Sequence, residues 1–339
     1  MKSTRLVSVC RFSSVTNSRL KIAFFGSDNF STISLNAIYN YCQLHNHQLD
    51  VITPSLKPTG RGLNQIIDLP IGELATSLDI PIHRVSTASD IIQLSNRYNL
   101  AIAVSFGKLI PGTFLTSCKY GGVNVHPSLL PRYSGASPLQ YCLLNDDKYT
   151  GCTVQTLHPT KFDRGDILIQ SDEVPIEYDD NFTSLEKKLG AIGAELLVET
   201  IDKGLFSKHG KFVNKYEFSL ASKIPRTRKQ VYWDKVSARQ VKRMEDALGS
   251  VYTFIPVNKK NKTDIHRVIL GGISEHQGDV DLDIPGQFTL SSDKLVIKTN
   301  NGCINVSTIQ QQTKNKQSPK EFINSFHKNI GDSIYQFIN

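Results

Sequence analysis

Between residues 20 and 203, short apolar runs alternate with longer segments in which apolar residues recur every three or four positions. The short runs predict buried strands, at residues 20–26, 49–53, 82–85, 100–106, 122–126, 152–157 and 166–170. The longer segments predict helices, at residues 33–44, 88–97, 137–144 and 181–203. Because strands alternate with helices, we expect an α/β domain with a Rossmann-like parallel sheet covered on both faces.

Beyond residue 231 the pattern changes to short strands separated by turn residues. These strands are expected at residues 251–255, 267–270, 295–298 and 303–307. A handful of such strands suits an OB-like β-barrel, an architecture that often binds nucleic acid. A short helix at 237–248 opens this region, and Ser318 with Glu321 is typical of a capped terminal helix.

A basic stretch interrupted by proline, at residues 221–229, separates the two patterns. It predicts a linker, because such composition packs poorly into helices or strands. The chain of 339 residues is long enough for two domains with their own cores. The predicted division is a leader at 1–19, an α/β domain at 20–206, a basic linker at 207–230 and a β-barrel domain at 231–339.

Composition narrows the class of protein. Hydrophobic residues make up 39% of the chain and charged residues 21%, as in ordinary globular proteins. Apolar runs stay well short of the ~18–20 residues that span a bilayer. The six cysteines are scattered without a C-x-x-C pair, which argues against a zinc site or a disulfide framework and favours a reducing compartment. A G-x-G-x-x-G motif after the first strand and a P-loop are both missing, so a dinucleotide site is weakly supported.

Charge is unevenly distributed along the chain, and both ends are basic. Residues 1–19 contain four basic residues, many Ser and Thr and no acidic residue, a composition typical of a mitochondrial presequence, although chance composition is the alternative. Residues 207–339 carry 21 basic and 12 acidic residues in a chain of net charge +8. This asymmetry suggests a polyanionic partner, and an ordinary solvated lysine surface is the alternative.

The candidate chemistry lies on the predicted strand at 122–126, which ends in Asn124, Val125 and His126. Since side chains alternate along a strand, Asn124 and His126 point to the same face. Pro127 cannot donate to a ladder and should end the strand. Ligands of open parallel sheets bind beyond the carboxyl ends of strands, so this pair marks a candidate site.

Asp163 can bring a carboxylate to the same site. The amide of Asn124 can donate to a carbonyl oxygen, the imidazole of His126 can transfer a proton near neutral pH, and a carboxylate can orient that imidazole. This set suits direct acyl transfer to an amine, which requires an oxyanion donor and a general acid or base but no nucleophilic Ser or Cys. Taken singly, each residue could equally satisfy local backbone groups.

These residues, with the stretch 128–133, resemble the motifs of the 10-formyltetrahydrofolate-dependent formyltransferases. The resemblance implies Asn124, His126 and Asp163 as the catalytic set, and Asp166 as a structural second acid of the Asp-x-Gly-Asp turn. Two positions depart from the family pattern: Ser134 stands where the family usually has arginine, and Arg164 where it has threonine.

The resemblance also implies 10-formyltetrahydrofolate as the co-substrate, and no metal. We expect the folate to lie against Phe106, Gly107, Leu109 and Ile110, with Ser128, Leu129, Leu130 and Pro131 closing one side.

A loop at 54–63, punctuated by proline and glycine, carries Lys57 and, between two glycines, Arg61. Alone it indicates an ordinary surface loop. Methionyl-tRNA formyltransferases have a basic insertion here that enters the acceptor stem, and Arg61 matches its arginine. The resemblance to mitochondrial members of this family implies transfer of a formyl group to the α-amine of methionyl-initiator tRNA in the matrix. The expected tRNA contacts are Lys57, Arg61, Arg226, Arg228 and Lys229, on a monomer without a membrane segment.

Other classes of protein fit the sequence less well. Glycinamide ribonucleotide transformylases end near the sheet domain, and sugar-nucleotide formyltransferases offer no reason for a basic extension. A folate-dependent hydrolase that releases formate stays open, as does a non-catalytic RNA-binding protein on the same scaffold. The intact set of Asn124, His126 and Asp163 counts against a purely binding role.

Overall fold

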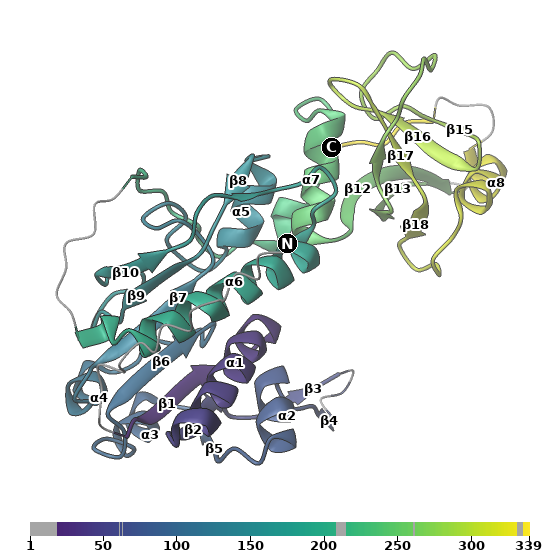
Figure 1. The fold of residues 1–339 in the computed structure, drawn as a ribbon. Helices are drawn as coiled ribbons and strands as arrows, with labels where there is room; N and C mark the ends of the chain where they lie inside the picture. The colour runs from purple at the N-terminus through teal and green to yellow at the C-terminus, as the bar shows by residue number, and fades with distance from the viewer. Residues whose placement is uncertain (1–18, 61, 63, 208–214, 260–261, 331–334) are drawn as a thin grey trace, which may run out of the picture. The chain divides into compact units, whose positions relative to one another are not determined.

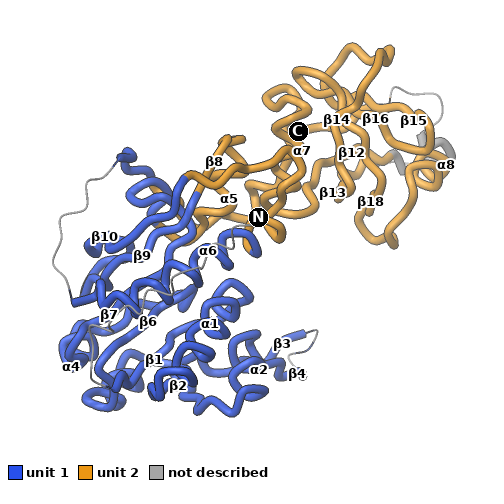
Figure 2. The backbone as a smooth tube through the Cα atoms, in the orientation of Figure 1, with its two compact units in different colours: residues 1–134, 151–172, 187–219 blue, residues 135–150, 173–186, 220–339 orange. Residues whose placement is uncertain are grey.

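The computed structural model describes residues 19–60, 62, 64–207, 215–259, 262–330 and 335–339. The chain divides into two compact units, each assembled from separate stretches (Figure 2). Unit 1 contains residues 1–134, 151–172 and 187–219, and unit 2 contains residues 135–150, 173–186 and 220–339. Two stretches that precede residue 187, at 135–150 and 173–186, therefore fold with the C-terminal part.

A seven-stranded sheet forms the centre of unit 1, in the order β10-β9-β7-β6-β1-β2-β5 (Figure 1). Its strands are β1 Lys21–Gly26, β2 Gln48–Pro54, β5 Ile82–Val85, β6 Leu100–Val104, β7 Gly122–His126, β9 Thr153–Thr156 and β10 Ile167–Gln170. The residues of β6 are all buried, as expected for a central parallel strand with both faces covered. The α/β architecture predicted from the hydrophobic pattern is thus confirmed.

The sheet is mixed at one edge, where a fully parallel sheet was expected. Strand β9 runs antiparallel to β7, with Asn124 opposite Gln155 and His126 opposite Thr153, and β10 runs antiparallel to β9. After β7 the chain enters β9 from the carboxyl edge of the sheet instead of crossing back over its face. The direction of β9 therefore follows from the connection, which apolar periodicity does not report.

Helices cover both faces of the sheet. They are α1 Asn29–His45, α2 Pro70–Ser77, α3 Ala88–Ile92, α4 Gly112–Ser117 and α6 Phe182–Asp202, whose first residues belong to unit 2. On one face α6 lies so close that a Cβ added at Gly193 would sit 2.8 Å from the side chain of Val125. On the other face Phe25 packs edge-on against Phe106 and Phe114. A small hairpin, β3 Pro58–Thr59 and β4 Gln65–Ile66, and the 3₁₀ turn η1 Leu205–Ser207 complete the unit.

The helix ends follow local hydrogen bonds that apolar spacing does not reveal. Helix α1 begins before the predicted 33–44 because Asp28 caps it, accepting from the Ser31 N–H at 3.0 Å. It ends where Asn46 adopts the left-handed conformation, with φ 54°. Helix α3 is shorter than the predicted 88–97 and ends at Ile92, before a turn in which Asn96 also has a positive φ.

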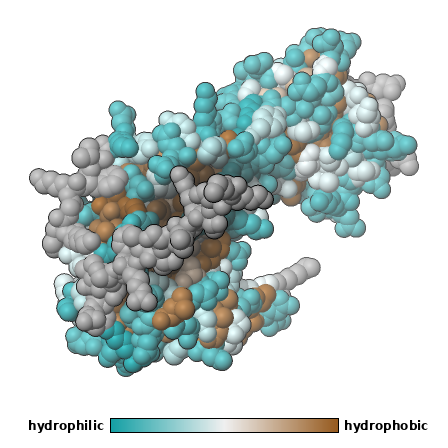
Figure 3. Space-filling view, in the orientation of Figure 1, coloured by the Kyte–Doolittle hydropathy of each residue, from teal (hydrophilic) through white to brown (hydrophobic). Residues whose placement is uncertain are grey.

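Unit 2 is rich in strands, as predicted for the C-terminal part. Its strands are β8 Tyr149–Thr150, β11 Val174–Pro175, β12 Val251–Lys259, β13 Lys262–Gly271, β14 Ser274–Glu275, β15 Phe288–Ser291, β16 Lys294–Lys298, β17 Cys303–Val306 and β18 Thr308–Gln311. Its helices are α5 Pro138–Leu144, η2 Arg226–Lys229, α7 Ala238–Leu248 and α8 Pro319–Ile330. The face of this unit seen in Figure 3 is mostly hydrophilic.

The strands expected to form an OB-like barrel are hydrogen-bonded as two antiparallel sheets, β12-β13-β18 and β14-β17-β16-β15. The chain passes from one sheet to the other at Gly272 and again at Ser307, whose N–H donates to the Gly271 carbonyl at 3.2 Å. Both sheets enclose one core that includes Trp233, Leu270 and Phe337. Within the described ranges, no helix has the length and apolar character needed to cross a membrane.

Candidate active site

Asn124 and His126 lie on β7, in the interior of the sheet, and their side chains alternate with that of Val125. Because Val125 packs toward α6, the two polar side chains face the opposite side. The loop after β6, residues 105–110, leaves the same carboxyl edge, since β6 and β7 are parallel neighbours. The predicted catalytic residues and the predicted folate-binding loop thus start from one edge of one sheet.

The ring of His126 is buried, with 5% of the residue exposed. Its Nε2 lies 2.9 Å from the backbone carbonyl oxygen of Tyr133, and its Nδ1 lies 3.4 Å from Oδ1 of Asp163. A carbonyl oxygen can only accept, so Nε2 carries a proton. When Nδ1 also carries a proton, the ring can donate toward Asp163 as well.

Asp163 reaches His126 from a turn, although the two residues are far apart in sequence. Its backbone φ is 50°, in the left-handed region, and its side chain is 10% exposed. Gln155, on β9, donates from Nε2 to Oδ1 of Asp163 at 3.1 Å. The carboxylate is therefore held from two sides, by an amide and by the imidazole.

Asn124 faces the same side of the sheet as His126 and is partly exposed. In the part of the chain that the structure describes, no hydrogen bond engages its carboxamide, which leaves the amide free to donate to a substrate oxygen. Asp166, the second acid of the same turn, is exposed, and its backbone N–H donates to Thr156 Oγ1 at 2.8 Å. The structure thus brings Asp163 to His126, and places Asp166 in the strand connection.

The loop at 127–134 is built to hold the Tyr133 carbonyl in place. Ser128 Oγ donates to the Arg132 carbonyl at 2.6 Å, and Thr153 Oγ1 donates to the Ser128 carbonyl at 2.6 Å. Ser219 Oγ accepts from the Tyr133 N–H at 2.9 Å. Tyr133 itself has a positive φ of 57°. Side chains from two distant stretches therefore fix the oxygen that orients His126.

The residues predicted to contact folate differ in exposure. Phe106, Ile110, Ser128, Leu129 and Leu130 are buried, whereas Gly107 and Leu109 are exposed and Pro131 is half-buried. Gly107 has a φ of 74°, and a Cβ added there would meet nothing within 4 Å. The available surface on this edge is therefore at Gly107, Leu109 and Pro131, and the buried members shape the loops beneath it.

One further acid lies near this edge. Burial raises the pKa of the Asp28 carboxyl above its ordinary value, while hydrogen bonds, first among them that from the Ser31 N–H, oppose the rise. Ser27, next to Asp28, donates from Oγ to the Ser105 carbonyl at 2.5 Å and joins β1 to the end of β6. Among the described residues no group of three or more His, Cys, Asp or Glu side chains could hold a metal ion.

The residues predicted to bind tRNA fall in two places. Lys57 is exposed and precedes β3, and Arg61 lies outside the described residues. Arg226, Arg228 and Lys229 belong to the 3₁₀ turn η2 in unit 2.

Three groups of the candidate site were not predicted from the sequence: the Gln155 amide, the Tyr133 carbonyl and the Ser219 hydroxyl. Gln155 and Ser219 reach the site only through strand pairing or loop packing. Tyr133 contributes a backbone atom, which carries no residue-type signal.

The chain is similar to known proteins over nearly its whole length. The family described as formyl transferase matches residues 20–201, and its C-terminal domain matches residues 223–327. The mitochondrial methionyl-tRNA formyltransferase of Saccharomyces cerevisiae is 31% identical over 97% of this chain and 96% of its own length. The methionyl-tRNA formyltransferase of Thermodesulfovibrio yellowstonii is 30% identical over 91% of this chain and 97% of its own length.

Solved structures share the fold at low identity. The HypX protein of Aquifex aeolicus in complex with tetrahydrofolic acid covers 92% of this chain and 48% of its own, with 16% identity and a TM-score of 0.57. An N-formyltransferase of Helicobacter canadensis covers 85% of this chain and 98% of its own, with 17% identity and a TM-score of 0.57.

The fold and the matched families define a formyl transferase, an enzyme that transfers one-carbon groups. More particularly, the chain belongs to the methionyl-tRNA formyltransferase family.

Proposed function

We propose that this chain transfers the formyl group of 10-formyltetrahydrofolate to the α-amino group of methionyl-initiator tRNA, and that it does so in the mitochondrial matrix as a monomer. The observation that carries the chemistry is the buried His126 ring, held between the Tyr133 carbonyl and Asp163, with the Asn124 amide on the same face. Full-length similarity to enzymes named for methionyl-tRNA supports the acceptor.

In the proposed reaction the α-amine attacks the formyl carbon, the new C–N bond forms, and the bond from that carbon to the folate nitrogen breaks. Negative charge develops on the formyl oxygen in between. The Asn124 amide donates to this oxygen. In this proposal Nδ1 of His126, 3.4 Å from Asp163, carries a proton and donates it to the developing oxyanion instead of to the carboxylate. Donors aimed at developing charge lower the barrier more than those that bind the ground state.

Two protons must also move. The attacking ammonium nitrogen loses one, and the folate nitrogen gains one as it leaves. Asp163, held by Gln155 at 3.1 Å, is the acceptor in this proposal, acting through water. His126 gives a proton to the leaving nitrogen and recovers one from Asp163, so that both side chains end in their starting protonation states.

The test is a formylation assay with charged initiator tRNA and 10-formyltetrahydrofolate. His126→Ala should lower kcat by about 10²–10⁴, the usual contribution of a general acid or base, while the fold persists. The matched control is His83→Ala, because His83 also pairs with an aspartate, Asp50, at 3.2 Å and lies on the far strand β5. Wild-type turnover in His126→Ala would remove the imidazole from the mechanism.

The same assay separates the alternatives. Formate released at the full rate without tRNA would identify a hydrolase, and tRNA binding with neither product would identify a binding protein.

The mitochondrial location rests on the leader at 1–19, most of which lies outside the described residues, and on the name of the yeast relative. A fusion of residues 1–19 to a fluorescent protein should accumulate in mitochondria, and replacing Arg5 and Arg11 with Glu should abolish this. Cytosolic fluorescence of the unaltered fusion would contradict the proposal.

A further inference from the structure

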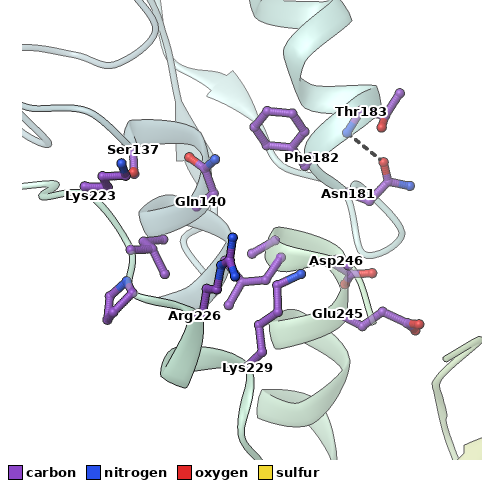
Figure 4. Close-up of a pocket in the computed structure, with 15 residues that line it drawn as sticks. Ser137, Gln140, Asn181, Phe182, Thr183, Lys223, Arg226, Lys229, Glu245 and Asp246 are labelled. Carbon is purple, nitrogen blue, oxygen red and sulfur yellow. Dashed lines mark hydrogen bonds between the residues drawn. The ribbon is translucent and has the colours of Figure 1, made fainter. Parts of the chain in front are cut away.

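A pocket of about 740 Å³ lies within unit 2, and none of the residues of the site at β7 line it. Its walls come from linker residues 223–226 and 229, the C-terminal turn of α7, the start of α6 and one side of α5 (Figure 4). The volume falls within the roughly 300–1,000 Å³ typical of pockets for small organic ligands. The proposed reaction uses none of this space.

Three cations line the pocket and have no partner among the residues that the structure describes. Lys223, Arg226 and Lys229 all line it, and in the described part of the chain none of them forms an ion pair or side-chain hydrogen bond. A 3₁₀ helix has about three residues per turn, so Arg226 and Lys229 share one face of η2. Figure 4 shows both side chains extending from η2 into the pocket.

The acidic residues of the lining are already engaged by other groups. Glu245 accepts from the backbone N–H groups of Gly272 and Ile273 at 2.7 and 2.6 Å. Asp246 accepts from Lys242 Nζ at 2.9 Å and from Arg243. The charge that remains unmatched in the pocket is therefore positive, which favours an anionic ligand.

The rest of the lining suits a planar, hydrogen-bonding group. The Phe182 ring and the Gln140 amide lie at the end of the pocket opposite η2 in Figure 4. An aromatic ring can stack on a nucleobase, and a side-chain amide can both donate to and accept from a base edge. No hydrogen bond within the described residues occupies the Gln140 amide. An anion site and a base site thus coexist in one cavity.

We propose that this pocket binds one nucleoside phosphate, with the phosphate on Arg226, Lys229 and Lys223 and the base between Phe182 and Gln140. The nucleotide can come from two sources: an unpaired nucleotide of the RNA substrate, which rests on the proposed function, or a free nucleotide. Both sources present the same two groups to the pocket, a phosphate and a base.

The first experiment measures equilibrium binding of the four ribonucleoside 5′-monophosphates, and of inorganic phosphate, to the full chain. We expect saturable binding of at least one nucleotide at millimolar concentration, weakened at least about tenfold by Arg226→Gln, the effect of losing one charge-assisted hydrogen bond. Arg228→Gln is the matched control, because it removes the same charge from the same turn at a residue that does not line the pocket.

Equal weakening by Arg226→Gln and Arg228→Gln, or no saturable binding, would overturn the proposal. Inorganic phosphate binding as tightly as the best nucleotide would overturn its nucleoside part. Phe182→Leu keeps an apolar side chain but removes the stacking surface, so it should weaken the nucleotide about tenfold and leave phosphate unchanged.

A second arm distinguishes the sources. If an RNA nucleotide enters the pocket, a saturating mononucleotide should compete with initiator tRNA for the wild-type chain, and this competition should disappear in Arg226→Gln. Undiminished tRNA binding in the presence of the mononucleotide would exclude the RNA source and leave the free nucleotide. Both measurements record binding without turnover, so failure of formyl transfer would leave their outcome readable.

Discussion

At the scale of single residues, the site depends on groups that act on His126 through other residues. Gln155 donates to Asp163, Asp163 approaches Nδ1, and the Tyr133 carbonyl accepts from Nε2. A ring placed between a fixed acceptor and a fixed carboxylate is held in one orientation, as the proposed mechanism requires. The proposed role of His126 therefore depends on the groups that hold its ring as well as on the imidazole itself.

We expect Gln155→Leu to lower kcat at least about tenfold, since the carboxylate loses a charge-assisted hydrogen bond and the orientation it provides. KM for the folate should change less than kcat, because Gln155 acts on Asp163 and not on the substrate. Steady-state kinetics measure both.

Gln48→Leu supplies the matched control, because Gln48 donates to Asp50 of the second His–Asp pair at 3.4 Å. Equal effects of Gln48→Leu and Gln155→Leu on kcat would contradict the positioning role.

Much of this site follows from the sequence. Alternation along residues 122–126 placed Asn124 and His126 on one face, and the structure has this strand at the same residues. Gln155 could not be found in this way, because its position opposite Asn124 depends on how β9 pairs with β7. A backbone oxygen such as that of Tyr133 leaves no trace in residue type at all.

At the scale of elements, Arg243 of α7 joins to α7 the two earlier stretches that fold with unit 2, residues 135–150 and 173–186. Its side chain is buried, and its guanidinium donates to Asp146 at 2.7 Å, to the Asp180 carbonyl at 2.9 Å and to the Glu177 carbonyl at 3.2 Å. One arginine thus joins the end of α5 and the connection before α6 to α7. Bidentate geometry of this kind is specific to the guanidinium.

Arg243→Met should destabilise unit 2 by roughly 3 kcal/mol, because it removes donors from buried carbonyl groups and a partner from Asp146. Chemical denaturation followed by the fluorescence of Trp233, which lies in the core of this unit, measures the change. Arg267→Met is the control: Arg267 is exposed and lies over the Tyr252 ring, so about 0.5 kcal/mol or less is expected. Similar losses in both variants would contradict the special role of Arg243.

The same cluster predicts a pH dependence. Hydrogen bonds from Arg239, and then from Arg243, hold the pKa of the Asp146 carboxyl below its ordinary value. A lowered pKa contributes stability that is present above the unfolded-state value of about 3.9 and is lost as pH falls through the folded value. Asp146→Asn should therefore lower the unfolding midpoint at pH 7, and the difference should shrink progressively below about pH 4. A difference that stays constant down to acid pH would contradict this linkage.

Apolar periodicity predicted most elements, and local chemistry decided their ends. The predicted helix at 237–248 corresponds to α7, whose capping box joins Ser237 and Gln240. Helix α1 begins at Asn29, whereas its predicted start was residue 33. Most residues of its first turn are polar and therefore do not contribute to the apolar periodicity. The direction of β9 and the division of the C-terminal strands into two sheets depend on contacts between segments distant in the chain, and a single sequence does not record them.

At the scale of the whole molecule, positive charge is concentrated in the C-terminal part, with 21 basic against 12 acidic residues after 206. We proposed five cations for tRNA contact, and each phosphate neutralised contributes about 0.9 to the slope of log K against log salt. Binding of initiator tRNA should therefore weaken about 10²–10³-fold between roughly 50 and 200 mM salt. Filter binding over this range gives the slope.

Within that series, Lys57→Gln and Arg228→Gln should each reduce the slope by about 1. Exchange of an exposed lysine outside the proposed set, such as Lys187→Gln, should leave it unchanged. An affinity that ignores salt would exclude a phosphate-dominated contact.

The interleaving of the two units has a consequence for synthesis. Asp146 and Asp180 are synthesised well before Arg243. The stretches 135–150 and 173–186 therefore leave the ribosome before the Arg243 side chain, which donates hydrogen bonds to both, has been made. The strands β9 and β10, which complete the N-terminal sheet, lie between those stretches in the nascent polypeptide. A nascent chain that ends near residue 219 would thus contain the N-terminal sheet and two segments without their packing partner. These segments can pack only after α7 has been synthesised.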